Sequence, residues 1–94
     1  MTFTEDATDA QRSAFVAAMA ELPSQIEGVG SFRSGLDLGL NPGNSDVVIV
    51  AEFTDETAWR AYLEAPAHVS FIEKHVTPLC ATWSAIQFDP SATP

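Results

Sequence analysis

His68 is the residue best suited to acid–base chemistry. It follows a proline that interrupts a helical pattern, in the run Pro66-Ala67-His68-Val69-Ser70-Phe71. An imidazole can accept a proton near neutral pH, and the dipole near a helix start disfavours its charged form. Tyr62, six residues earlier, could orient a substrate carbonyl or hydroxyl. In the alternative reading both are structural: His68 hydrogen-bonds locally at the helix break, and Tyr62 is a core residue with a wet hydroxyl.

The remaining histidine and the cysteine favour packing over chemistry. His75 follows His68 by seven residues, two turns along one helical face, whereas a metal-binding pair usually has i, i+4 spacing. Cys80 is alone, so the sequence predicts no internal disulfide and no cysteine-based metal site. We therefore expect neither a metal ion nor a cofactor, with Cys80 as a small buried residue.

Apolar and aromatic residues could line a pocket near His68. Phe71 and Trp83 are the aromatic residues predicted to face it, and most others are assigned to the core. Val48, Val50 and Glu52 share one parity of an apolar run, so they line the pocket if that face points inward. Glu52 is then a pocket acid, or it pairs with an arginine, Arg33, on the neighbouring strand. The aromatic residues assigned to the core are Trp59, Phe32, Phe53 and Phe88.

The first half of the chain is predicted to contain a short strand, a helix and a hairpin. The strand covers residues 1–4, and Thr8 with Gln11 forms a capping box that starts the helix. Strands over residues 29–38 and 47–53 flank the run Asn41-Pro42-Gly43-Asn44. Proline followed by glycine at the two central positions is typical of a type II turn, so these two strands should pair.

The second half is predicted to contain an interrupted helix and a last strand. Thr54 or Asp55 can cap the helix, Pro66 breaks it, and Pro78 should end it at about residue 77. The last strand covers residues 82–88, and residues 90–94 form a loose tail. The whole order is β-α-β-β-α-β, an α+β ferredoxin-like fold with one antiparallel sheet.

One face of this sheet needs a cover that a single chain does not supply. Two helices cover one face, yet residues 47–53 are apolar on both parities, whereas a half-exposed antiparallel strand should alternate. The simplest cover is the same face of a second copy. The sequence therefore predicts a homodimer that closes through its sheets into an α/β barrel.

Charge and hydropathy exclude several classes of partner. The 94 residues form one domain with a formal net charge of −9, which opposes binding to nucleic acids and to anionic membrane surfaces. No apolar run approaches the roughly 20 residues that span a bilayer, and the start of the chain lacks a signal-peptide pattern. We expect a cytoplasmic protein.

Three runs together resemble the stress-responsive dimeric α/β-barrel family, called Dabb. They are residues 35–46, the strand that ends Ala51-Glu52-Phe53, and the run Pro66-Ala67-His68-Val69-Ser70-Phe71. The resemblance covers about residues 3–88, and the domain is expected to span residues 1–89. It implies two ferredoxin-like units packed sheet to sheet.

The resemblance also implies alternatives for function. Some plant relatives close linear polyketides without a cofactor, with a histidine and a tyrosine at the positions of His68 and Tyr62. Other pocket residues of those cyclases are missing: Val47 and Ser45 stand near a histidine and a tyrosine position, and a first-strand histidine is absent. Some relatives hold a cation on backbone carbonyls, which would correspond to the stretch containing Pro23, Ile26 and Val29.

Three functions follow as hypotheses. The first is a Dabb homodimer of undefined activity with a pocket for a small hydrophobic or phenolic ligand. The second is a cofactor-independent enzyme, polyketide cyclase-like or monooxygenase-like, with His68 as general base and Tyr62 as helper. The third is a purely structural dimer with a filled barrel. Because a short first strand leaves its neighbours without partners, further residues upstream are also expected.

Overall fold

The computed structural model describes residues 1–91, and its first half follows the predicted order. Strand β1 (Thr2–Phe3) leads to helix α1 (Asp9–Glu21) and the 3-10 turn η1 (Leu22–Gln25). The capping box is confirmed: Thr8 Oγ1 accepts from the Gln11 amide at 3.1 Å, and Gln11 Oε1 accepts from the Thr8 amide at 2.8 Å. These two bonds satisfy amide groups that a helix start leaves unpaired.

Strands β2 (Val29–Leu36) and β3 (Val47–Phe53) form the predicted antiparallel hairpin. Gly43 has φ 86°, as the second central position of a type II turn requires. Strand β2 was expected to reach residue 38, but it ends at Leu36. The reason is Asp37, whose carboxylate accepts from the Gly39 amide at 3.0 Å and from Asn44 Nδ2 at 3.2 Å, and so turns the chain out of the sheet.

The second half is a series of short helical pieces. Helix α2 (Glu56–Glu64) is capped by Asp55, whose Oδ1 accepts from the Ala58 amide at 2.8 Å. Ala65 is extended, with ψ 133°, because it precedes a proline, and helix α3 (Pro66–Phe71) starts at that proline. The predicted break is thus confirmed. A π-helical turn η2 (Ile72–Val76), helix α4 (Thr77–Leu79) and strand β4 (Cys80–Thr82) follow.

Two predictions for this half are wrong. Pro78 does not end the helical segment at residue 77, because it lies in the first turn of α4, where proline's missing N–H costs no helical bond. The last strand was expected over residues 82–88, but β4 ends at Thr82, because its partner β1 has only two residues. Of the loose tail predicted for residues 90–94, residues 92–94 lie outside the described part.

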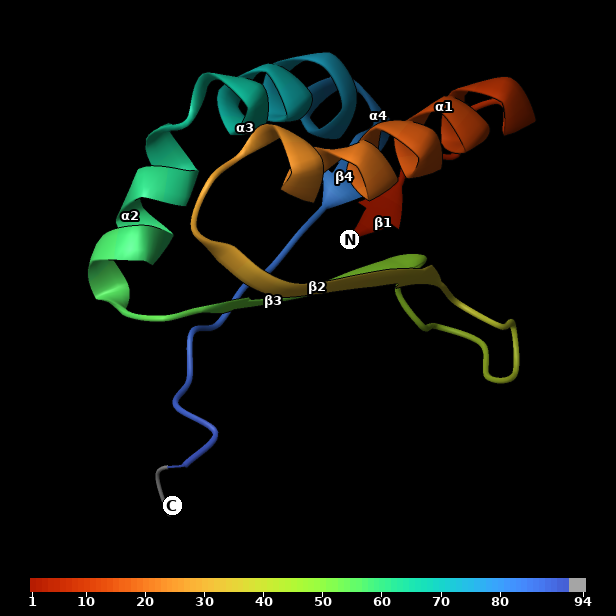
Figure 1. Ribbon diagram of the computed structural model, residues 1–94. Helices are drawn as coiled ribbons and strands as arrows, with labels where there is room; N and C mark the ends of the chain where they lie inside the picture. Colours follow the sequence, from red (N-terminus) through yellow and green to blue (C-terminus); the bar gives the residue numbers. More distant parts are fainter. Residues whose placement is uncertain (92–94) are drawn as a thin grey trace.

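All the helices lie on one side of the sheet layer (Figure 1). The expected single sheet is divided into two pieces, β1 with β4 and β2 with β3. The pieces meet where Met1 and Val47 exchange backbone hydrogen bonds of 2.8 and 3.0 Å. Asp46 Oδ2 also accepts from the Phe3 amide at 2.9 Å. The order β4-β1-β3-β2 is therefore the ferredoxin-like one, and the fold class is confirmed.

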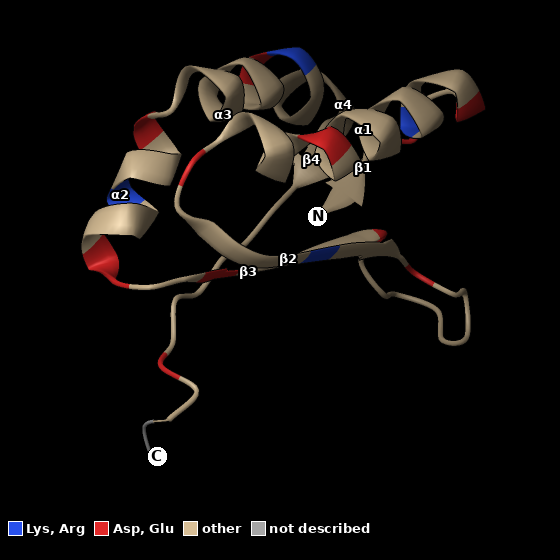
Figure 2. Cartoon of the chain, viewed as in Figure 1, with Lys and Arg blue, Asp and Glu red and all other residues tan. Residues whose placement is uncertain are grey.

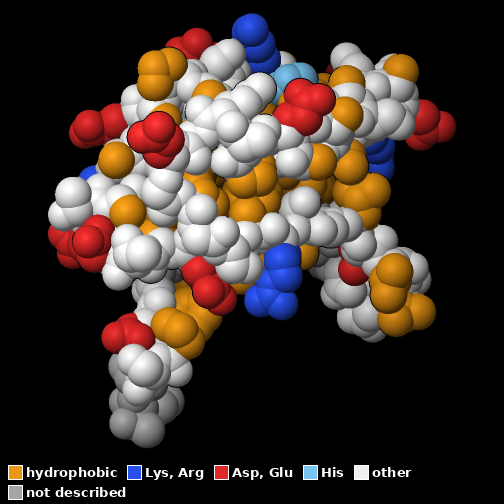
Figure 3. Space-filling model, viewed as in Figure 1, with side chains coloured by type: hydrophobic (Ala, Val, Ile, Leu, Met, Phe, Trp, Pro, Cys, Tyr) orange, Lys and Arg blue, Asp and Glu red, His pale blue; other side chains and the backbone are white. Residues whose placement is uncertain are grey.

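The core lies between α1, the α3–η2 segment and the strands. Phe15 is fully buried, with its ring centroid 5.2 Å from that of Phe3 and 5.3 Å from that of Phe71. Met19 and Leu22 are also fully buried, and Cys80 is a buried core residue as expected. The apolar side chains appear as an orange band between the helices and the hairpin (Figure 3).

The opposite face of the hairpin is open. Val48 and Val50 are 56% and 39% exposed, although both belong to a strand rather than a loop. In Figure 1 only the hairpin loop and the segment after β4 extend below this face. That segment carries Trp83, Ile86 and Phe88, all largely exposed. The two-faced apolar strand predicted from the sequence is thus present and uncovered in one chain.

Acidic residues are spread over helices, strands and loops and form no single patch (Figure 2). The four lysines and arginines are scattered as well, so no basic surface opposes the net charge of −9. Among the described residues, no helix has both the length and the apolar character required to cross a membrane.

Candidate functional site

Tyr62 and His68 meet across the break between α2 and α3. Their ring centroids are 4.4 Å apart, with an interplanar angle of 48°. The other side of Tyr62 faces Phe53 at the end of β3, at 5.1 Å between centroids. Because the extended Ala65 redirects the chain, a tyrosine near the end of one helix and a histidine near the start of the next become neighbours. Phe53, Tyr62 and His68 thus form an aromatic row on the helix side of the sheet.

The surroundings of His68 define where its proton lies. Its Nδ1 is 3.3 Å from the carbonyl oxygen of Leu63. A carbonyl only accepts, so Nδ1 carries the proton and Nε2 keeps its lone pair. Burial lowers the pKa of His68 below 6.5, and the bond to Leu63 opposes this in part. The ring is therefore neutral near pH 7, with one nitrogen able to accept a proton or a hydrogen bond.

Tyr62 supplies the complementary polar group. Its side chain is buried, and burial raises the pKa of its phenol above 10.0, so it remains protonated. Within residues 1–91 no buried side-chain oxygen or nitrogen lacks a hydrogen-bond partner, and the Tyr62 hydroxyl bonds to none of these residues. The hydroxyl must therefore reach solvent. A phenol donor and an imidazole acceptor side by side suit a ligand that carries a hydroxyl or carbonyl group.

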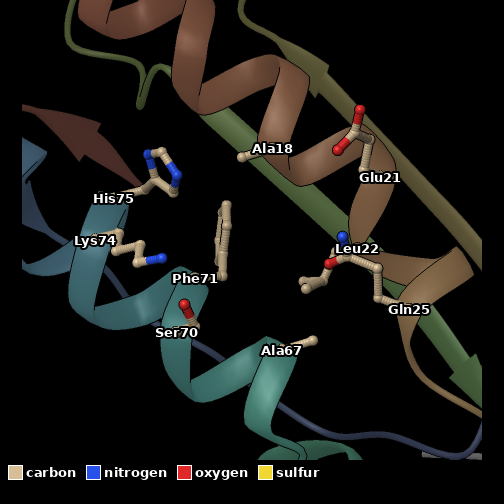
Figure 4. Close-up of a pocket in the computed structure, with 9 residues that line it drawn as sticks. All are labelled: Ala18, Glu21, Leu22, Gln25, Ala67, Ser70, Phe71, Lys74 and His75. Atoms are coloured by element: carbon tan, nitrogen blue, oxygen red, sulfur yellow. The ribbon is translucent and has the colours of Figure 1, made fainter.

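A shallow groove lies elsewhere, between α1 and the α3–η2 segment (Figure 4). Its volume is about 170 Å³. Phe71 and His75 project into it toward α1, and Lys74 lies at its rim. His75 packs edge-on against Phe15, with ring centroids 6.3 Å apart, in agreement with its interpretation as a packing residue. Neither Tyr62 nor His68 lines this groove, so Phe71 contributes to a different surface from theirs.

The structure does not bring the predicted pocket residues together. Val48, Val50 and Glu52 lie on the open face of β3, and the sheet separates them from Tyr62 and His68. Trp83 is 59% exposed beyond the end of β4. Parity correctly grouped the three β3 residues, but parity alone does not say which face the helices cover.

The expected pairing of Glu52 with Arg33 is not formed. Arg33 lies opposite Val50 in the hairpin register, and the register shifts between Val29 and Phe32, so Glu52 has no regular partner on β2. Within the described part of the chain the ion pair present is Arg60 with Glu56, at 3.0 Å on the exposed side of α2. Glu52 therefore remains an exposed carboxylate on the open face.

Metal and cation sites receive no support from side chains. Residues 1–91 contain no group of three or more histidine, cysteine or acidic side chains that could hold a metal ion. Pro23 lies in η1, Ile26 follows it, and Val29 begins β2. A cation on their backbone carbonyls stays a prediction.

Sequence reasoning missed one functional partner, the carbonyl of Leu63. In a regular helix the carbonyl of residue 64 would accept from the backbone N–H of His68, four residues later. The imidazole of His68 would then point away from the carbonyls of the preceding turn. The break at Pro66 moves the Leu63 carbonyl to the imidazole. The proline was the available signal, but it indicates that the chain turns and not which carbonyl the ring meets.

Residues 1–90 match the family model of the stress responsive A/B barrel domain, Dabb. A dimeric ferredoxin-like protein of unknown function from Thermobifida fusca is 31% identical, with 93% of this chain and 81% of that chain covered and a TM-score of 0.84. A protein from Arabidopsis thaliana is 20% identical, with 99% and 91% covered and a TM-score of 0.81. No match is found among curated proteins.

A Dabb family protein with a ferredoxin-like fold from Mesorhizobium loti is 22% identical, with 97% and 90% covered and a TM-score of 0.81. At these identities the Arabidopsis and Mesorhizobium structures show likeness of fold alone. This likeness agrees with the ferredoxin-like fold of this chain.

Proposed function

The chain belongs to the stress-responsive A/B barrel family, and on this basis we propose that it acts as a homodimer in which the open faces of two β2–β3 hairpins pack together. The observation that carries this proposal is the exposure of Val48 and Val50 on a strand whose other face packs against the core. A relative that is 31% identical is described as dimeric, which supports the same arrangement here. A self-complementary face closes most simply by two-fold symmetry.

Sedimentation of matched charge variants tests the dimer. Val50→Glu places a carboxylate on the open face of a chain whose net charge is already −9, so we expect a monomer. Val69→Glu is the control, because Val69 is exposed to nearly the same degree, 40% against 39%, but lies on α3 on the helix side. A wild-type monomer at micromolar concentration, or equal effects of the two variants, would contradict the proposal.

We further propose that each subunit binds a small hydrophobic or phenolic ligand at Tyr62 and His68. The phenol donates, the Nε2 of His68 accepts, and Phe53 gives an apolar surface beside them. The test is an NMR titration with phenol and with resorcinol. Binding should shift the His68 ring signals and weaken in Tyr62→Phe, which keeps the ring and removes only the hydroxyl. Unchanged His68 signals at saturating ligand would rule out this site.

A second candidate function is cofactor-independent catalysis with His68 as general base. The observation that favours it is the Leu63 contact, which holds the proton on Nδ1 and leaves Nε2 free to accept. His68→Ala should abolish turnover of a polyketide-like or phenolic substrate while leaving the melting temperature unchanged. Parallel losses of turnover and melting temperature would identify a structural histidine. The cytoplasmic location, the role in stress and the lack of nucleic-acid binding stay predictions.

A further inference from the structure

The open face of the β2–β3 hairpin carries one cation and one carboxylate. Of all the residues in β2 and β3, only Arg33 and Glu52 have a charged side chain. Arg33 lies directly opposite Val50, and Glu52 follows Val50 by two residues, so the three side chains share one face. In Figure 3 blue and red side chains project below the hairpin, away from the helices. Both signs of charge therefore lie beside the exposed valines of this face.

Neither charge is neutralised within one chain. Among residues 1–91 the ion pair present is that of Arg60 with Glu56, so Arg33 and Glu52 belong to none. Both side chains are exposed, and water solvates them while the face is open. A cover that excluded water would leave each charge without a partner, which strongly destabilises a buried charge. Whatever packs on this face must therefore supply a carboxylate for Arg33 and a cation for Glu52.

We propose that Arg33 of each subunit forms an ion pair with Glu52 of the other subunit when the two open faces pack together. The inference rests on the proposed dimer and adds how its two faces are oriented. In a two-fold interface, contact of Arg33 with Glu52 of the second copy implies contact of Glu52 with Arg33 of that copy. Both charges of each face are then paired. An orientation that brought like residues together would leave two repelling pairs instead.

The same charges explain why two acidic chains meet through this face. The formal net charge is −9, so two copies repel each other over most of their surfaces. The two strands of the hairpin sum to zero and carry both signs, so their open faces attract each other in one orientation and repel in others. Val48 and Val50, 56% and 39% exposed, add apolar area beside the charges. A second copy of this chain thus matches both the charge and the apolar character of the face.

Mixing two charge-reversed variants tests the pairing between subunits. Arg33→Glu alone brings two carboxylates together, and Glu52→Arg alone brings two guanidinium groups together. We expect the dimer dissociation constant to rise about tenfold or more in each variant. An equal mixture restores both ion pairs, because one copy supplies two carboxylates and the other two guanidinium groups. Native mass spectrometry of the mixture should show heterodimers in excess over homodimers, and sedimentation should give an affinity close to that of the wild type.

The control variants make the same changes in net charge away from the interface. Lys74→Glu matches Arg33→Glu, and Glu73→Arg matches Glu52→Arg. Lys74 and Glu73 lie in η2, on the helix side of the sheet. We expect both controls to dimerise as the wild type does and to give only statistical heterodimers when mixed. Effects equal to those of the hairpin variants would mean that overall repulsion, and not a specific pair, is responsible.

The remaining outcomes separate the pairing from the dimer itself. A wild-type monomer at micromolar concentration would contradict both. A wild-type dimer whose mixed variants form only statistical heterodimers would contradict the pairing and leave the dimer standing. Recovery in a chain that carries both reversals, without recovery in the mixture, would place the ion pair within one chain. If a reversed charge prevents folding, Arg33→Gln, Glu52→Gln and their double variant replace it, and additive effects on dissociation would refute the pairing.

Discussion

The imidazole of His68 and the carbonyl of Leu63 lie on opposite sides of a helix break and are joined by a 3.3 Å contact. The contact holds the ring against Tyr62 and selects one tautomer. It is formed because Ala65 is extended before Pro66, so a local rule about proline geometry determines the orientation of the most reactive side chain.

The first prediction concerns the titration of His68. Burial lowers its pKa in the folded chain below the ordinary 6.5, so the unfolded chain binds the proton more tightly. The stabilising contribution is complete above pH 6.5 and is lost as pH falls through the lowered pKa. In NMR, the His68 ring should titrate at lower pH in the native protein than in urea. A native midpoint equal to or above the unfolded one would contradict this.

The second prediction concerns the link between the two sheet pieces. Asp46 accepts from the Phe3 amide and so fastens β1 to the start of β3. Asp46→Ala should lower the free energy of unfolding by about 1 to 3 kcal/mol, because it leaves a partly buried amide unpaired. Asp46→Asn keeps an acceptor oxygen and should recover most of the loss. Urea denaturation measures both, and equal stabilities for the two variants would show that this bond does not matter.

The third prediction concerns the hairpin turn. Gly43 has φ 86°, where a side chain is strained, so Gly43→Ala should cost about 1 kcal/mol. Gly35 lies in β2, lacks a positive φ, and has open space where a Cβ would stand. Gly35→Ala should therefore change stability by about 0.5 kcal/mol or less. Thermal unfolding of the two variants compares the positions, and a larger loss for Gly35→Ala would be incompatible with this turn.

The fourth prediction concerns the core. Phe15 is fully buried and contacts Phe3, Phe71 and His75, so Phe15→Ala should cost about 3 to 5 kcal/mol. Leu63→Ala on α2, where the side chain is 40% exposed, should cost about 1 kcal/mol or less. The measurement is urea denaturation at one protein concentration. Similar midpoints for the two variants would place the core elsewhere.

Much of the fold could be predicted because its signals are local. Thr8 and Gln11 are three residues apart, the Asn41–Asn44 turn is contiguous, and Pro66 acts on its own neighbour, Ala65. The strand expected over residues 82–88 failed for the opposite reason. Its alternating apolar residues are suited to a strand, but pairing needs a partner far away in sequence, and β1 is too short.

The site was predictable only in part. Tyr62 and His68 were expected together, and their rings do meet. The other pocket residues depended on which sheet face the helices cover, and the pattern of β3 is apolar on both faces. The sequence of such a strand does not distinguish the face that packs on the core from the open face. Val48, Val50 and Glu52 were therefore predicted to lie with Tyr62 and His68, although the sheet separates the two groups.

The division of the sheet has a consequence for how the molecule opens. The described backbone bonds between its two pieces all involve Met1, and the Asp46 carboxylate adds one more. Few hydrogen bonds therefore attach the β2–β3 hairpin to the β1–β4 piece. Helix α2 also contacts both strands of the hairpin. We expect the hairpin to behave as a separate cooperative unit that unfolds before the Phe15 core, so that amide exchange divides the chain into a fast half and a slow half.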